Sequence, residues 1–224
     1  MHDSDLITQK KFKEISNDLL STPDTFESQT VESRLSDLIK ELDYYQKLTH
    51  TLSKKLELSE ARAVVDYLTQ ALNKSAYDLK IGQVLREFSR YKEPVALMVV
   101  DIDNFKKIND QFGHKTGDQA LVSVAASIQN CIRKSDSLFR YGGEEFVVLT
   151  NKICAEDANN LAEKIRTQIE KNCFIDQNPV NKITVSIGVS LLMESDTEHS
   201  LFKRADDAMY ASKHKGRNAV TMVD

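Results

Sequence analysis

The sequence is poor in the residues that break helices or crosslink chains. Its 224 residues include seven glycines and three prolines, and no glycine lies in the first seventy positions. Pro23 is the only proline there, so the residues from 24 to 70 lack the strongest helix breakers. The three cysteines, Cys131, Cys154 and Cys173, are odd in number and show no C-x-x-C spacing. This pattern argues against a disulfide framework or a zinc site and predicts reduced thiols.

Long apolar runs and an excess of basic charge are missing as well. The N-terminus has neither the basic nor the apolar segment of a secretory signal. The longest apolar run, residues 95–100, is far shorter than the roughly 20 residues of a membrane helix. We expect a cytoplasmic protein with no membrane partner. The net charge of −4 gives no reason to expect nucleic acid as a partner.

The chain reads as a helical region, residues 1–65, followed by a globular domain, residues 66–224. Its length suits one catalytic core with a smaller accessory element. Apolar residues between Leu6 and Leu20 predict a short amphipathic helix. Ser21–Asp24 then predicts a break and restart, with Thr22 as N-cap and Pro23 at the first helical position.

From residue 31 onward, apolar and small residues recur in steps of three and four. They are Val31, Leu35, Leu38, Leu42, Tyr45, Thr49, Leu52, Leu56, Ser59 and Ala63. Such a heptad stripe predicts a coiled coil. The alternative is one amphipathic helix lying on the globular domain. A helix reaching about 50 Å is longer than one domain easily covers, so self-association is favoured.

After Asp66 the sequence alternates between two periodicities. Helices are expected at 76–91, 117–133, 155–171 and 199–215, and strands at 95–100, 137–141, 145–150, 182–192 and 218–222. Mixed blocks of this kind predict an α/β fold, an α+β sandwich whose central sheet is flanked by helices. Gly142 and Gly143 separate two of the strands and predict a hairpin.

Two acidic motifs lie at expected strand ends. Asp101 and Asp103 follow the apolar strand, and carboxylates two residues apart share a face on which they can hold Mg²⁺. Plain solvation of a strand end is the alternative. Glu144 and Glu145 follow the two glycines, which remove side chains and permit positive φ near a bulky ligand. The alternative there is an ordinary turn with an acidic flank. Should the two strands be neighbours, both motifs would converge on one metal, as nucleotidyl transfer requires.

Several motifs together resemble the GGDEF family of diguanylate cyclases. Gly142-Gly143-Glu144-Glu145-Phe146 is similar to the name-giving motif in its GGEEF variant. Residues 101–118 resemble the pattern D-x-D-x-F-K-x-x-N-D-x-x-G-H-x-x-G-D, and Ala205–Asn218 also fits. The resemblance covers residues 66–224. It implies a nucleotidyl-cyclase or palm-like fold with a mostly antiparallel sheet.

The resemblance also implies a role for individual residues. Mg²⁺, with Mn²⁺ as a substitute, would be held by Asp101, the Ile102 carbonyl and Glu144. Either Glu144 or Glu145 would take the proton from the 3′-hydroxyl group, and the sequence leaves that choice open. Asn109 and Asp118 would read the guanine base of the substrate GTP. The rest of the substrate-binding set would be His114, Phe105, Lys106, Gly142, Gly143, Lys213 and Arg217. Alternatively, Phe105 is only a core residue, and Lys213 only caps the C-terminus of a helix.

Two further features concern control of the domain. Arg133 and Asp136 fit the family's R-x-x-D site for inhibition by the product, cyclic di-GMP; a solvated helix end is the alternative. The motif that opens the domain usually reads D-x-L-T-G-L-x-N, whereas here Gln70 and Ala71 surround the position of the glycine. This change of backbone freedom is expected to affect how the stalk couples to the domain.

The resulting hypothesis is a homodimer joined by the coiled coil. Each domain holds one GTP, and each 3′-hydroxyl group attacks the other's α-phosphate, so dimerisation is part of catalysis. A regulatory protein is a candidate partner for the N-terminal helices. Two rival classes are a non-catalytic cyclic di-GMP receptor and a coiled-coil scaffold. A different nucleotidyl cyclase or a polymerase palm is disfavoured by Asn109 and Asp118, which indicate guanine.

Overall fold

The computed structural model describes residues 28–62, 64–173, 175 and 182–223. The chain divides into two compact units, Met1–Ser59 and Glu60–Asp224. The short helix expected between Leu6 and Leu20, and the break expected at Ser21–Asp24, lie outside the described residues. Across the described part of the chain, no helix is both long enough and apolar enough to span a membrane.

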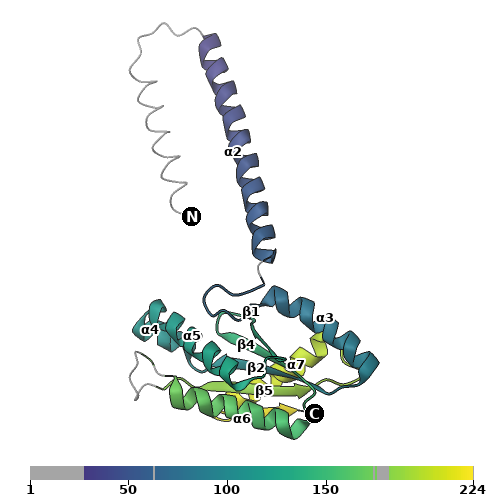
Figure 1. The fold of residues 1–224 in the computed structure, drawn as a ribbon. Coiled ribbons are helices and arrows are strands. Elements are labelled where there is room, and N and C mark those ends of the chain that lie inside the picture. The colour runs from purple at the N-terminus through teal and green to yellow at the C-terminus, as the bar shows by residue number, and fades with distance from the viewer. Residues whose placement is uncertain (1–27, 63, 174, 176–181, 224) are drawn as a thin grey trace. The chain divides into compact units, whose positions relative to one another are not determined.

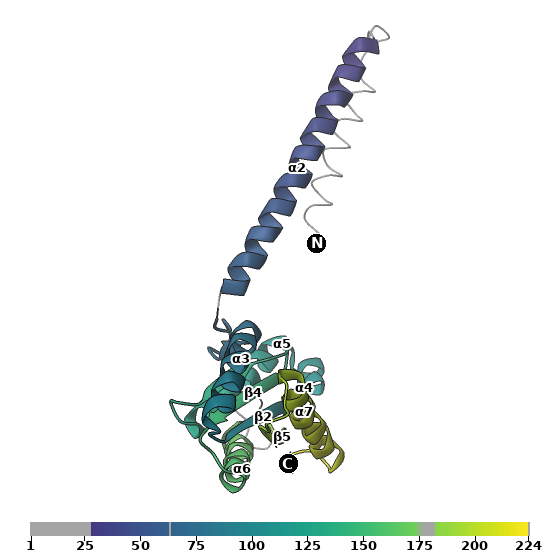
Figure 2. The same cartoon turned by 90° about the vertical axis from the view of Figure 1, so that its right-hand side faces the viewer.

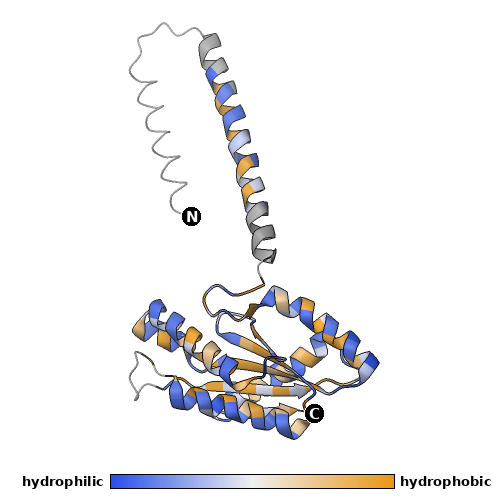
Figure 3. Cartoon of the chain, in the orientation of Figure 1, coloured by the Kyte–Doolittle hydropathy of each residue, from blue (hydrophilic) through white to orange (hydrophobic). Residues whose placement is uncertain are grey.

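Helix α2 (Ser28–Arg62) is continuous over 35 residues (Figure 1), as predicted from the absence of glycine and proline. In the single chain its heptad side chains are 38–58% exposed; these are Leu35, Leu38, Leu42, Tyr45 and Leu52. The polar heptad residue Thr49 donates its hydroxyl to the Tyr45 carbonyl, 2.8 Å away. Figure 3 shows apolar and polar residues alternating along α2. The described apolar side chains of the stripe are exposed to solvent in the single chain.

The second unit is built on a six-stranded sheet in the order β1-β3-β4-β2-β5-β6. The strands are β1 (Leu72–Asn73), β2 (Val95–Ile102), β3 (Ser137–Arg140), β4 (Glu145–Asn151), β5 (Val185–Leu191) and β6 (Val220–Val223). The three central pairings are antiparallel, and both edge strands pair in parallel. The predicted α/β fold with a mostly antiparallel central sheet is confirmed.

Helices cover both faces of this sheet (Figures 1 and 2). Alternate residues of β2 belong to the cores on the two faces. Ala96, Met98 and Val100 pack with α4 (Phe105–Phe112), α5 (His114–Cys131) and α6 (Ala155–Asn172). Residues Val95, Leu97 and Val99 pack with α3 (Lys74–Tyr91) and α7 (Glu198–His214). Burial on both faces explains why residues 95–100 of β2 are an unbroken apolar run, and Figure 3 shows orange along the central strands.

Side-chain and backbone caps mark the ends of α3 and the start of α7. The Asn73 side chain accepts a hydrogen bond from the Ala76 amide and caps α3, whose last turn closes on Lys92 in the left-handed conformation. Thr197 and Ser200 form a reciprocal capping box at the start of α7. Such caps satisfy amides and carbonyls that the first and last turns leave without partners.

A closed turn at residues 64–73, here called the N-terminal turn, opens the second unit. The Asp66 amide donates to the Ala71 carbonyl at 2.8 Å, and the Asn73 amide donates to the Val64 carbonyl at 3.0 Å. Gln70, which stands where the family pattern has glycine, has φ 60°. It thus keeps the left-handed backbone at a cost on the order of 1 kcal/mol. The departure from the pattern therefore leaves a non-glycine residue in a conformation that glycine adopts more easily.

Candidate active site

The two acidic motifs meet at one end of the central strands. Asp101, near the end of β2, stands opposite Glu145, the first residue of β4, in the antiparallel register. The Ile102 amide donates to the Glu144 carbonyl at 3.4 Å. Residues directly opposite in an antiparallel pair point to the same face of the sheet. The structure therefore brings together the two motifs that the sequence places far apart.

These carboxyl groups raise one another's pKa in a partly dry environment. Burial, and then the charge of Asp101, raise the pKa values of Glu144 and Glu145. Burial is also the main cause of the raised pKa of Asp101, which is 4% exposed. Asp206 on α7 has a raised pKa for the same reason, with Asp207 adding to it. We call Asp101, Glu144, Glu145 and Asp206 the carboxylate cluster.

One ammonium group opposes this charge. Lys213, in the last turn of α7, places Nζ 2.8 Å from Asp101 Oδ1 as an ion-pair partner. It also lowers the pKa of each other member of the carboxylate cluster. Lys213 was expected to bind the triphosphate or to cap a helix. The structure shows it as the cation of the carboxylate cluster.

The glycine hairpin (residues 141–145) is tight because two amides share one acceptor. The amides of Tyr141 and Gly142 both donate to the Glu145 carbonyl, at 2.9 and 3.2 Å. Neither glycine has positive φ, so the hairpin uses only the missing side chains. A Cβ atom on Gly142 would lie 2.5 Å from Glu145 Oε2, whereas one on Gly143 would meet nothing within 4 Å. Open space therefore lies beside Gly143.

The expected guanine-reading residues lie on two helices that touch closely. A Cβ atom on Gly117 of α5 would lie 1.9 Å from Asn109 Oδ1 of α4 and 3.3 Å from Phe105 Cζ. Gly117 is therefore the small residue that lets Asn109 approach α5, next to Asp118. Sequence reasoning noted Gly117 only as part of a motif. A glycine inside a helix is the signal that marks such a contact.

The other expected substrate-binding residues differ in their exposure. Asp118, His114, Lys106 and Arg217 have exposed side chains. Phe105, by contrast, is 8% exposed and belongs to the core between the sheet and α5. Its ring packs inside the domain, as the alternative interpretation held, so only its backbone remains for a ligand.

Asp103 was expected to share a metal ion with Asp101, but its carboxylate has other hydrogen-bond partners. Its two carboxylate oxygens accept hydrogen bonds from the hydroxyls of Thr184 and Ser186, both at 2.7 Å, and from the Asn218 amide at 2.9 Å. Asp103 therefore anchors the loop that carries Arg217. Because these donors already occupy its oxygens, Asp103 is not free to share a cation with Asp101.

The residues proposed for Mg²⁺ fit the ion by their chemistry. No group of three His, Cys, Asp or Glu side chains in the described ranges is arranged to hold a metal. The expected set instead contains two carboxylates and the carbonyl of Ile102, all oxygen donors, as Mg²⁺ prefers. Asp101 Oδ1 is buried, and among the described residues its close contact is with the ammonium group of Lys213, 2.8 Å away, which lacks regular hydrogen-bond geometry. A buried oxygen that already lies against a positive charge suits a metal cation.

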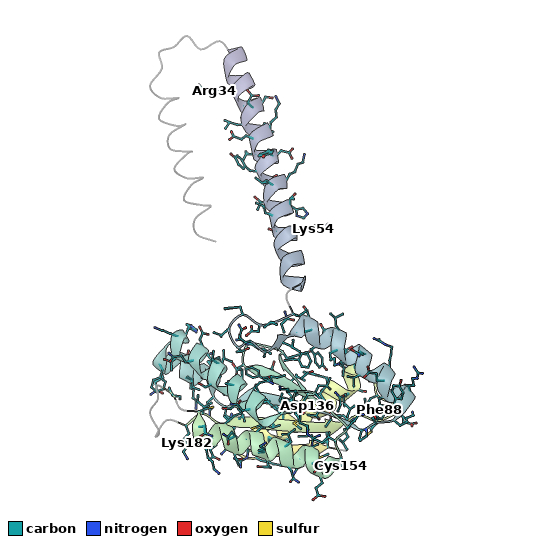
Figure 4. All side chains as sticks on the ribbon, in the orientation of Figure 1. Arg34, Lys54, Phe88, Asp136, Cys154 and Lys182 are labelled. Carbon is teal, nitrogen blue, oxygen red and sulfur yellow. The ribbon has the colours of Figure 1, made fainter. Side chains whose placement is uncertain are left out.

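Arg133 and Asp136 form a separate feature at the turn before β3. The Arg133 amide donates to Asp136 Oδ2 at 2.9 Å, and the Asp136 amide donates back to the Arg133 carbonyl at 3.0 Å. Asp136 Oδ1 is buried without a hydrogen-bond partner among the described residues. Arg133 also lines a pocket of about 370 Å³ whose other wall includes Phe88 and Tyr91 of α3. Figure 4 labels Phe88 and Asp136.

Comparison with known proteins identifies the class of this domain. Residues 63–219 match the family model described as diguanylate cyclase, GGDEF domain. The chain therefore belongs to the GGDEF domain family of diguanylate cyclases.

Individual relatives agree with this assignment. The response regulator PleD of Caulobacter vibrioides is 37% identical over 207 residues, which are 91% of this chain but 44% of PleD. The chain thus spans less than half the length of that relative. The crystal structure of the coiled coil and GGDEF domain of DgcB from Caulobacter crescentus, in complex with c-di-GMP, matches with a TM-score of 0.68 and 32% identity, covering 87% of this chain and 100% of that one.

A third similar structure is also of a GGEEF domain. The structure of the active GGEEF domain of a diguanylate cyclase from Vibrio cholerae is 36% identical, with a TM-score of 0.59, over 63% of this chain and 90% of that one.

Sequence reasoning missed one cation beside the site. Lys74, the first residue of α3, places Nζ 4.6 Å from the centre of the Tyr141 ring, and its charge lowers the pKa of Glu145. Its neighbour Asn73 is part of the family motif, but no pattern links Lys74 to the hairpin. Only the parallel pairing of β1 with β3 brings this segment close to it.

Proposed function

We propose that this chain is a diguanylate cyclase, which condenses two GTP molecules into cyclic di-GMP and releases two pyrophosphates. The observation that carries the proposal is the meeting of Asp101, Glu144 and Glu145 beside the open glycine hairpin, in a domain of this family. Because the matched relative PleD is longer, the activity is proposed for this domain in particular. The proposed division remains 1–65 and 66–224.

Asp101, the Ile102 carbonyl and Glu144 are the proposed ligands of Mg²⁺, with Mn²⁺ as a substitute. When bound, the ion neutralises the triphosphate and stabilises the charge that develops at the reacting phosphorus. Lys213, Lys106 and Arg217 would hold the phosphate oxygens through charge-assisted hydrogen bonds. The Phe105 backbone, in the first turn of α4, offers amides to the phosphates. Gly142 and Gly143 leave room for the nucleotide.

The guanine base is assigned to Asn109 and Asp118, with His114 beside them in the substrate-binding set. A carboxylate accepts hydrogen bonds from the guanine N1–H and exocyclic amine, a donor pair that adenine lacks. Asn109 supplies an amide that can donate and accept. The contact of Asn109 with Gly117 fixes its distance from α5 and supports this assignment.

Glu144 or Glu145 takes the proton of the 3′-hydroxyl group. A general base works best when its pKa approaches the working pH, and burial raises the pKa of both residues in that direction. Glu145 has an additional cation nearby in Lys74, which lowers its pKa. Both glutamates therefore stay candidates for the base.

Two domains are required because each supplies one GTP. The apolar stripe of α2 supports a coiled-coil homodimer, since its heptad side chains are exposed in the single chain. Pairing two helices raises the effective concentration of the two half-sites. A regulatory protein that binds the N-terminal helices would act on this pairing.

Arg133 and Asp136 are proposed to bind cyclic di-GMP as an inhibitor. The unpartnered Asp136 Oδ1 and the adjoining pocket support a ligand there. Arg133 can form paired hydrogen bonds with guanine or phosphate, and Phe88 and Tyr91 offer rings for stacking. A receptor without catalysis is the second candidate, favoured by the same pocket.

The test is turnover of GTP with Mg²⁺ by protein stripped of bound nucleotide, followed by chromatography of cyclic di-GMP and pyrophosphate. Glu144→Gln should abolish product, while Glu156→Gln, on the exposed surface of α6, should not. If formation of cyclic di-GMP stops early in the wild type but continues in Arg133→Ala, the inhibitory site is supported. Tight cyclic di-GMP binding without turnover would favour the receptor. A cellular role unaffected by Glu144→Gln would favour the scaffold.

A further inference from the structure

Arg140 connects two parts of the domain that are distant in sequence. Its Nη1 atom lies 3.1 and 3.2 Å from the two carboxylate oxygens of Asp66, in the N-terminal turn. Its Nη2 atom donates to the Gly143 carbonyl at 2.8 Å. One guanidinium group therefore holds the N-terminal turn on one side and the glycine hairpin on the other.

Asp66 is held firmly enough to act as a fixed point for this arginine. Besides Arg140, its carboxylate accepts hydrogen bonds from the amide and the hydroxyl of Thr69, at 2.8 and 2.6 Å. The side chains of Asp66 and Arg140 are 14% and 16% exposed. The hydrogen bonds of Thr69 and the charge of Arg140 lower the pKa of Asp66, although burial opposes them. Asp66 thus remains charged at neutral pH.

The backbone reinforces this link. Leu72 and Asn73 of β1 pair in parallel with Phe139 and Arg140 of β3, so Arg140 sits where the turn joins the sheet. Gly143, in contrast, is an exposed position in the hairpin. Its carbonyl is held by the side chain of Arg140, and so the orientation of the peptide that follows depends on that side chain.

We propose that Arg140 is a positioning residue for the reaction and that Asp66 sets its position. The hydrogen bond to the Gly143 carbonyl orients the peptide leading into Glu144, whose own carbonyl accepts a hydrogen bond from the Ile102 amide next to Asp101. This inference rests on the proposed function for its catalytic consequence. Because Asp66 closely follows the end of α2 in the chain, a rearrangement of the N-terminal turn changes the hairpin as well.

The test compares Asp66→Asn and Arg140→Lys with a matched control, Asp196→Asn. Asp196 also forms a partly buried ion pair, with Arg204, and its side chain accepts hydrogen bonds from the Met193 amide and the Ser200 hydroxyl. That pair stabilises the start of α7, and within the described residues no hydrogen bond or ion pair joins it to the hairpin. All kinetics are measured on the full chain well below the melting temperature of each variant.

Asp66→Asn and Arg140→Lys should lower kcat by about tenfold or more while KM for GTP stays within about twofold, as expected for misplaced catalytic groups. The double variant should be no slower than the slower single variant, because both act through one hydrogen bond. Asp196→Asn should leave kcat unchanged. Unchanged kcat in the first two variants, or a loss shared equally by the control, would overturn the proposal.

A second measurement keeps this inference separate from the activity itself. Amide hydrogen exchange of residues 141–146, followed by mass spectrometry, should be faster in Asp66→Asn and Arg140→Lys than in Asp196→Asn. If the wild type forms no cyclic di-GMP, the proposed function fails and this exchange alone decides whether Arg140 holds the hairpin. Equal exchange in all variants would refute the positioning role.

Discussion

At the scale of single residues, the site is dominated by an imbalance of charge. The carboxylate cluster brings four acids together at the end of β2, where Lys213 is ion-paired with Asp101 and Lys74 adds a second charge near Glu145. Burial raises the pKa of each acid, which means that the folded protein favours the protonated form. Such an arrangement costs stability at neutral pH, and a bound cation would relieve that cost.

The pH dependence follows from the direction of these shifts. The folded pKa values of Asp101 and Glu144 exceed the unfolded ones, so the unfolded chain loses these protons first. The free energy of unfolding contributed by these groups therefore falls as pH rises from the ordinary carboxyl range through the raised values. Mg²⁺ competes with protons for the same oxygens, so it should raise the melting temperature more at neutral pH than in acid.

Thermal unfolding with and without Mg²⁺ across that pH range checks this expectation. Asp101→Asn should melt higher than the wild type at neutral pH without metal and should lose the Mg²⁺ effect. A stabilisation by Mg²⁺ that persists in Asp101→Asn would place the ion elsewhere.

A second residue-scale prediction concerns Gly117. By helix propensity alone, Gly→Ala stabilises a helix interior by up to about 1 kcal/mol. Gly82→Ala on α3, where the nearest atom is Arg86 Nη1 at 3.5 Å, should show that gain. Gly117→Ala should instead push Asn109 aside, because its Cβ would lie 1.9 Å from Oδ1. We expect KM for GTP to rise about tenfold, equivalent to about 1.4 kcal/mol.

Steady-state kinetics and thermal melting of both variants separate these effects. Because Asn109 can rotate, Gly117→Ala should fold, with its loss confined to GTP affinity. An unchanged KM would mean that Asn109 does not bind the substrate.

At the scale of elements, the position of α7 depends on one small residue in β5. A Cβ atom on Gly188 would lie 2.0 Å from the Ala205 carbonyl oxygen and 2.1 Å from the Met209 amide nitrogen. These are backbone atoms of α7, which cannot rotate away as a side chain can. Gly188 therefore fixes the distance of α7 from the sheet, and with it the place of Lys213.

Two glycine substitutions should both lower activity but differ in their effect on stability. Gly188→Ala should lower the free energy of unfolding by about 3 kcal/mol, as overpacking does, and should reduce turnover with it. Gly143→Ala should melt like the wild type, since its Cβ meets nothing within 4 Å, yet lose activity by obstructing the nucleotide. Denaturant unfolding alongside turnover distinguishes them. A fully active Gly143→Ala would place the substrate away from the hairpin.

At the scale of the whole molecule, the proposed dimer depends on α2. Its apolar stripe is a feature that one chain leaves exposed, and pairing with a second copy would bury it. The proposed reaction needs two domains, so the same stripe that drives association would also control the rate.

Leu42→Lys tests this dependence, with Tyr44→Lys as the matched control. Both residues are well exposed in the single chain, at 58% and 62%, but only Leu42 belongs to the heptad stripe. Leu42→Lys should give monomers by sedimentation equilibrium and a cyclase rate that falls steeply on dilution, whereas Tyr44→Lys should stay dimeric. Dimers that survive Leu42→Lys would indicate another interface.

Much of the fold follows from local sequence. The apolar run of β2, the heptads of α2 and the cap of α7 each specify their element through neighbouring residues, so their predicted ranges agree with the structure to within a few residues. The short parallel strand β1 was not foreseen, since two residues carry no periodic signal and depend on β3 for their hydrogen bonds.

The sequence by itself determined most of the elements, the family, and Asp101, Glu144 and Glu145 among the four acids, because these reside in spacing along the chain. Only the tertiary structure decided which groups meet. It pairs Asp101 with Lys213, gives Asp103 to the loop before β6, and joins Asp66 to Gly143 through Arg140. Contacts of this kind depend on strand register and helix packing, which bring together residues whose separation along the chain carries no information about their distance.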